Sequence, residues 1–128
     1  MSSADALVTW LREQITAAET STRTLLLWAQ QTILTLQDPK LLGKHIPGWH
    51  DWPDVEKMCQ QRLTELDAKR RILDEFTSAQ HWADTLRAEG KHVQAEPYAR
   101  QAGTWLSAAR LLALPFAGQP GYRDEWRP

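Results

Sequence analysis

Histidines are the first residues in this sequence whose types and spacing could support chemistry. His45 and His50 lie on either side of a Pro-Gly turn and Asp51 follows directly, so the three invite interpretation as metal ligands. Carboxylate-bridged sites in helical bundles need a Glu-x-x-His motif from each of two helices. This sequence has the motif at Glu89–His92, where Gly90 is expected to interrupt the helix. With a single cysteine, zinc sites built on paired cysteines are excluded. The sequence therefore predicts no metal site and no cofactor.

Nucleophilic catalysis has equally little support. Cys59 falls on an apolar helical stripe, where a thiol is buried and inert. Ser107 lies inside a predicted helix without the strained turn that exposes the serine of a hydrolase. Neighbouring carboxylates such as Asp74 and Glu75 point in different directions on a helix. We therefore predict no catalytic residue and no enzymatic activity.

The main basic cluster is Lys69, Arg70 and Arg71, with Arg62 on an earlier turn. The carboxylates around this cluster are Glu65, Asp67, Asp74 and Glu75. Because they neutralise it, our first interpretation is a solvated, ion-paired helix face. Two alternatives stay open: Arg70 and Arg71 could grip carboxylates of a protein partner, or the cluster could contact nucleic acid phosphates.

Seven tryptophans are the compositional anomaly of the chain. Trp49 and Trp52 lie on a Pro- and Gly-rich connection, and tryptophan is enriched in binding hot spots. They are candidate partner-binding residues, or else they close the end of a bundle. The C-terminal stretch carries Phe116, Tyr122 and Trp126, which we expect to dock along the protein itself, with partner engagement of Tyr122 and Trp126 as the alternative.

Composition limits the class of protein. The chain has 128 residues, enough for one domain, and its 15 basic and 16 acidic residues give a net charge of -1, so no overall field attracts nucleic acid. No apolar run approaches the roughly 18 residues of a membrane span. A single cysteine suits a reducing compartment, and we expect a cytoplasmic protein.

Hydrophobic spacing predicts three helices, over residues 4–37, 53–89 and 95–114. The first starts at a cap provided by Ser3 or Asp5, and its weak point is Thr20–Thr24, where poor helix propensity could bend or break it. Its predicted buried stripe is Leu7, Leu11, Ile15, Ala18, Leu25, Ala29, Ile33 and Leu36, flanked by Trp10 and Trp28. Gly90 is expected to end the second helix and Pro115 the third.

The predicted fold is a single all-α domain over residues 1–128. It is a bundle of two long antiparallel helices and a shorter third one, with an irregular aromatic tail at residues 115–128 packed on it. Two long helices cannot bury their stripes alone. Either they fold back into four or five shorter helices, or a second copy covers the remainder and makes a homodimer.

Three stretches resemble an uncharacterised family of small proteins of actinobacteria and their phages: "DALVTWLREQI", "LDAKRRILDEF" and "LLALPFAGQPGYRDEWRP". The tail carries the most specific part of the likeness, which spans about half of the chain. Where family members read His-Asp-Pro, this sequence has His50, Asp51, Trp52 and Pro53. The family has no assigned activity, so the resemblance implies no catalytic residue and no ligand.

The function we predict is that of a small non-enzymatic protein-binding protein, a phage-derived modulator or inhibitor of a host protein. Its candidate partner-binding residues are Trp49, Trp52, Arg70, Arg71, Tyr122 and Trp126. The alternative is a helical protein associated with nucleic acid through Arg62, Lys69, Arg70 and Arg71.

Overall fold

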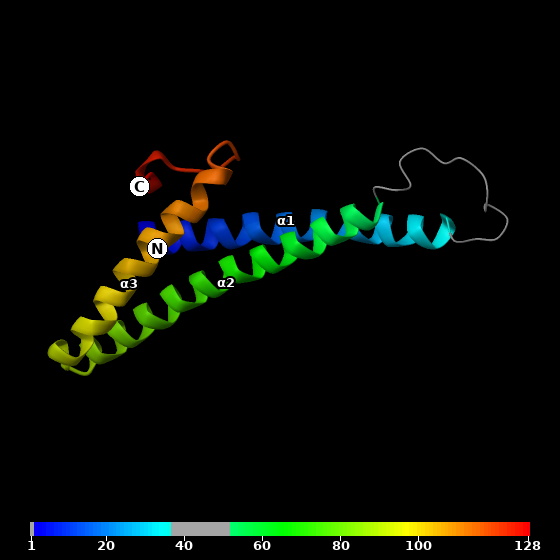
Figure 1. Ribbon diagram of the computed structural model, residues 1–128. Helices are drawn as coiled ribbons and strands as arrows, with labels where there is room; N and C mark the ends of the chain where they lie inside the picture. The colour runs from blue at the N-terminus through cyan, green and yellow to red at the C-terminus, as the bar shows by residue number, and fades with distance from the viewer. Residues whose placement is uncertain (1, 37–51) are drawn as a thin grey trace. The chain divides into compact units, whose positions relative to one another are not determined.

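Three α-helices make up most of the computed structural model, which describes residues 2–36 and 52–128 (Figure 1). They are α1 (Ser3–Leu36), α2 (Trp52–Ala88) and α3 (His92–Ala113), and two short 3₁₀ helices follow at Leu114–Phe116 and Asp124–Trp126. The described residues contain no strand, so the predicted all-α class is confirmed. In the same residues, no helix combines the length and the apolar character that crossing a membrane requires.

The helix α1 runs without a break through the threonine-rich segment that its composition marked as weak. The hydroxyl of Thr20 donates to the carbonyl of Thr16 at 3.0 Å, that of Thr22 to Ala18 at 2.7 Å, and that of Thr24 to Thr20 at 3.0 Å. Each threonine thus bonds to the carbonyl one turn before it, so its hydroxyl is satisfied without leaving the helix.

The start of α1 differs from the prediction in its capping residue. Ser2, rather than Ser3 or Asp5, caps the helix: its Oγ accepts a hydrogen bond from the Asp5 backbone N–H at 3.1 Å and donates to Asp5 Oδ2 at 2.8 Å. The Asp5 carboxylate thus holds in place the hydroxyl that caps its own backbone N–H.

A glycine turn joins α2 to α3. Gly90 has φ +77°, its N–H donates to the Arg87 carbonyl at 3.0 Å, and the N–H of Lys91 donates to the Leu86 carbonyl at 2.8 Å. These two bonds form a Schellman motif, which ends α2 where the sequence predicted. The next helix begins at His92, about one turn earlier than predicted, because it accommodates Pro97 in its second turn.

The chain divides into two compact units. The first comprises Met1–Ile15 and Ala68–Pro128, and the second comprises Thr16–Asp67. The first unit contains the start of α1, the second half of α2, α3 and the tail. Its buried side chains are Leu7, Val8, Trp10, Leu11 and Ile15 of α1, Leu73, Phe76, Ala79 and Ala83 of α2, Ala95, Ala102, Ala109 and Ala113 of α3, and Trp126.

The second unit is built from the remainder of α1 and the first half of α2. The apolar side chains buried in its described part are Ala29, Cys59 and Leu66. Cys59 is 3% exposed, as its place on the α2 stripe predicted. Leu25 and Trp28 of α1, by contrast, were assigned to the buried stripe and its flank, but they are 44% and 65% exposed. A pair of helix segments has one shared seam, so side chains more than about a quarter turn from it face solvent.

The C-terminal tail packs on the first unit, as predicted. Figure 1 shows it beside the first turns of α1. Trp10 Nε1 donates to the Pro120 carbonyl at 3.0 Å, and the Trp10 ring centroid lies 5.7 Å from that of Tyr122 and 5.4 Å from that of Trp126. A hydrogen bond of 2.9 Å from Ser3 Oγ to Glu125 Oε1 joins the two ends of the chain. The tail therefore belongs to the core of this unit.

Candidate protein-binding surface

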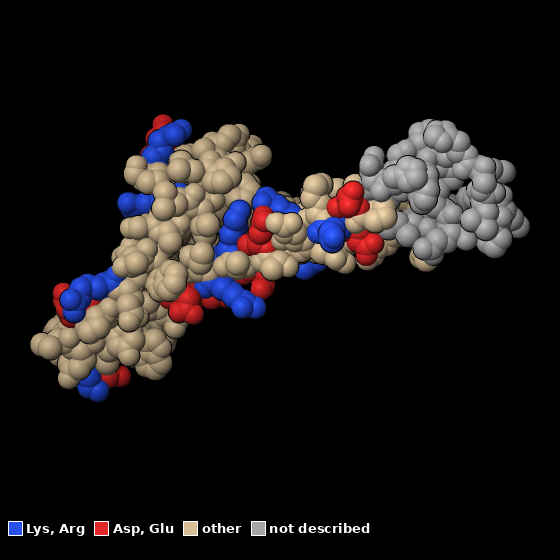
Figure 2. Space-filling view, in the orientation of Figure 1, with Lys and Arg blue, Asp and Glu red and all other residues tan. Residues whose placement is uncertain are grey.

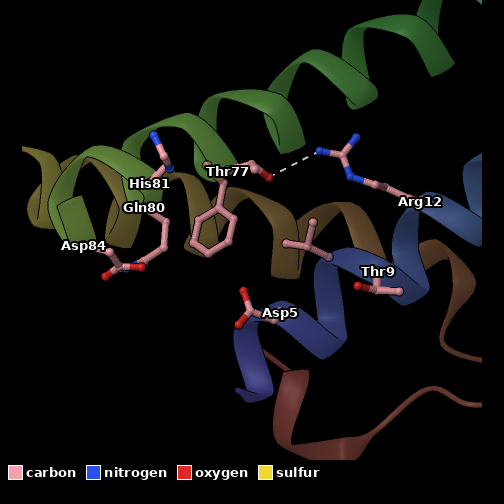
Figure 3. A pocket seen from close by; sticks show the side chains of 9 residues that line it. Asp5, Thr9, Arg12, Thr77, Gln80, His81 and Asp84 are labelled. Atoms are coloured by element: carbon pink, nitrogen blue, oxygen red, sulfur yellow. Dashed lines mark hydrogen bonds between the residues drawn. The ribbon is translucent and has the colours of Figure 1, made fainter. Parts of the chain in front are cut away.

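A groove in the first unit is lined mainly by polar side chains. It has a volume of about 370 Å³, and its walls are Asp5, Val8, Thr9 and Arg12 of α1 with Phe76, Thr77, Gln80, His81 and Asp84 of α2 (Figure 3). Arg12 pairs with Asp74 at 2.9 Å and also donates to Thr77 Oγ1 at 3.3 Å. Gln80 Nε2 donates to Asp84 Oδ1 at 2.9 Å. The two interactions of Arg12 join α1 to α2, and the Gln80–Asp84 bond lies within α2. None of the three joins a nucleophile to a base.

The structure describes the side chains of four of the six residues predicted to bind a partner. Trp49 lies outside the described residues, as do His45 and His50, and Trp52 opens α2 with a side chain that is not described. Arg71 is exposed and Arg70 half-buried, and both interact with other residues. Tyr122 is half-buried and Trp126 only 2% exposed. In this conformation the Trp126 side chain therefore offers almost no surface to a partner.

Two arginines of the tail lie over aromatic rings of the tail. The guanidinium of Arg123 lies 5.3 Å from the centroid of the Trp126 ring, and that of Arg127 lies 5.7 Å from the ring of Tyr122. Lys69 of α2 lies in the same way over Phe116, at 5.7 Å. Such stacking of cations on ring faces adds to the attachment of the tail. Part of the basic cluster thus stabilises the fold.

A surface that the sequence analysis missed lies on the second half of α1. Leu27, Trp28 and Leu34 are 58%, 65% and 68% exposed. With the exposed residues Thr20, Thr24 and Gln31 they form what we call the outer face of α1. Its members at 20, 24, 27, 31 and 34 are separated by steps of four, three, four and three, the spacing of a seam between packed helices. The same helix therefore carries a second seam besides the buried one.

The outer face is electrically neutral. From Thr24 to Leu36 the chain has no Asp, Glu, Lys or Arg. The nearest charges of α1, Glu19 and Arg23, lie 3.8 Å apart and pair with each other. Because a solvated helix face normally carries charged side chains, this absence of charge over more than three turns is unusual for an exposed helix segment.

Three threonine hydroxyls on this part of α1 already have hydrogen-bond acceptors in the helix. Thr20 and Thr24 bond to carbonyls of their own helix, and Thr32 Oγ1 donates to the Trp28 carbonyl at 2.8 Å. Burying an unpaired hydroxyl costs about 1–3 kcal/mol, and these hydroxyls already have their acceptors. The outer face can therefore be covered by another apolar surface without that penalty at its threonines.

Comparison with known proteins gives a family for the chain and no activity. Neither the curated proteins nor the solved structures contain a match. The model of a protein family described as "Family of unknown function (DUF6221)" matches residues 4–128, which is almost the whole chain and includes the tail that packs on Trp10. The chain therefore belongs to this family of unknown function.

Proposed function

We propose that this protein is a small, non-enzymatic protein that acts by binding another protein, with the outer face of α1 as its docking surface. The observation that carries the proposal is the exposure of Leu27, Trp28 and Leu34 on a helix segment without charge. A single exposed leucine needs no explanation. Three large apolar side chains within two helical turns form a patch, and such patches mark interaction sites on soluble proteins.

The composition of the face suits protein rather than nucleic acid. Tryptophan and leucine contribute large contact areas, and tryptophan is among the residues that dominate binding energy. The alternative through the basic cluster has weaker support, because Arg62 lies 3.8 Å from Glu65 and Lys69 lies over Phe116. On the side of the molecule seen in Figure 2, basic and acidic side chains are interspersed and form no extended basic patch.

A narrower form of the proposal concerns biological role. The likeness of the central segment and the tail to proteins of actinobacteria and their phages supports a phage-derived modulator of a host protein that works in the cytoplasm. In that role Trp49, Trp52, Arg70 and Arg71 stay predicted contacts to the host protein. Tyr122 and Trp126 could contribute only if the tail leaves Trp10.

The proposal is tested by affinity capture from a lysate of the source cells, with the tagged chain as bait. The change is the double substitution Leu27→Glu with Leu34→Glu, which places two charges on the outer face. The matched control is Val93→Glu with Leu111→Glu on α3, where the side chains are 85% and 58% exposed. We expect the wild type and the control to retain the same proteins, copies of the chain itself included, and the outer-face variant to lose at least about 90% of one of them.

The proposal fails if the outer-face variant retains every captured protein as well as the control does. Circular dichroism of both variants guards against misfolding, since the substituted side chains are all more than half exposed and helix content should not change.

A further inference from the structure

We propose that the protein covering the outer face of α1 is a second copy of this chain, so that the protein is a homodimer joined through residues 20–34 of α1. This inference rests on the proposed function, because it names the occupant of the same surface.

The first argument is that the described residues of the second unit form two helical layers and no third one. In the first unit, α3 and the tail accompany the segments of α1 and α2, and the buried side chains include members from all of these elements. The second unit has segments of only two helices in its described part, and it buries Ala29, Cys59 and Leu66 there. Two-helix segments with one thin seam gain stability when another helix covers their open side.

The second argument is charge. A partner of opposite charge is selected by charged residues, and the outer face has none between Thr24 and Leu36. The surface that matches it best is equally apolar and neutral, and the outer face of a second copy meets that requirement. A two-fold axis brings identical patches together, so no further complementary surface is needed.

The third argument is spacing and area. Steps of four and three place Thr20, Thr24, Leu27, Gln31 and Leu34 along one line of the helix, the geometry in which two helices interlock side chains. From the exposed fractions of Leu27, Trp28 and Leu34, these three side chains offer about 400 Å² per copy, or about 800 Å² for a pair, and the exposed side chains of Thr20, Thr24 and Gln31 add to that area. An interface of this size belongs to the weak, transient class, so the dimer should dissociate at micromolar concentration.

The inference is tested by sedimentation velocity on the purified full chain over about 1–300 μM. For the wild type and for the Val93→Glu, Leu111→Glu control we expect the mass to rise from 14.7 kDa towards twice that value with concentration. Leu27→Glu with Leu34→Glu should weaken dimerisation at least about 100-fold, since the two-fold axis doubles every introduced charge. The neutral pair Leu27→Gln with Leu34→Gln should weaken it about 10-fold. Raising the salt concentration from 50 to 500 mM should change the dissociation constant less than about twofold, because no charged pair contributes.

A wild type that stays monomeric up to 300 μM overturns the inference, and so does a dimer that the outer-face substitutions leave intact. The first result, combined with capture of a different protein that depends on the outer face, would assign the face to that protein and leave the proposed function standing.

Discussion

Gly121→Ala is expected to lower the free energy of unfolding by about 2–4 kcal/mol. Gly121 has φ +91°, a conformation that costs a residue with a side chain about 1–2 kcal/mol. A Cβ at this position would also lie 2.7 Å from Trp10 Nε1, the atom that donates to the neighbouring Pro120 carbonyl. Because overpacking adds about 1–3 kcal/mol, the substitution should push the tail away from Trp10. Denaturant titration followed by tryptophan fluorescence measures the loss.

Two other glycines separate the causes of that loss. Gly90 has φ +77°, but a Cβ added there would meet nothing within 4 Å, so Gly90→Ala should cost only about 1 kcal/mol. Gly118 has open space and no such backbone angle, so Gly118→Ala should change stability by less than about 0.5 kcal/mol. Equal stability of all three variants would contradict the packing of the tail against Trp10.

Trp126→Ala is expected to cost about 3–5 kcal/mol, the range for removing a large buried aromatic ring. Trp126 is 2% exposed, and its ring contacts Trp10 and Tyr122 with centroid separations of 5.4 and 5.8 Å. The indole N–H of Trp126 makes no hydrogen bond to any described residue. Trp126→Phe should therefore cost much less, about 1 kcal/mol, because it keeps most of the ring area and removes an unsatisfied donor. Thermal unfolding with circular dichroism distinguishes the two variants.

The matched control for this position is Trp82→Ala. Trp82 is 49% exposed and has an edge contact with His81 at 5.6 Å, so its loss should cost about 1 kcal/mol. Gly121→Ala combined with Trp126→Ala should lower the free energy of unfolding little more than the more destabilising single variant does. Either substitution already detaches the tail from Trp10, so the second one has little left to remove. Fully additive losses would contradict a tail that docks as one piece.

Much of the fold could be predicted from hydrophobic spacing. The predicted limits of the two long helices agree with α1 and α2 to within one residue, and Gly90 ends α2 as expected. The sequence allowed a bend or break at Thr20–Thr24, but α1 is one helix there, because tertiary packing outweighs weak local propensity. The packing of the tail against Trp10 could not be predicted, because the hydrogen bond from Trp10 to Pro120 joins residues 110 positions apart.

The candidate site was missed because one apolar stripe was assigned to α1. Leu25 and Trp28 were placed on or beside that stripe, but the helix carries two seams, and the second one includes Leu27 and Leu34. The signal was present in the sequence as an uncharged segment from Thr24 to Leu36 with steps of four and three. What the sequence could not provide is which of the two seams faces α2, because that depends on the packing of both helices.

The central claim is that the outer face of α1 is a surface on which protein docks and that a second copy of this chain occupies it. The most direct measurement is amide hydrogen exchange by mass spectrometry on the purified chain at 1 and 300 μM. We predict that peptides covering residues 20–34 exchange more slowly at the higher concentration, while peptides covering residues 104–114 of α3 do not change. Unchanged exchange in residues 20–34, with slowing confined to α3 or the tail, would contradict the account.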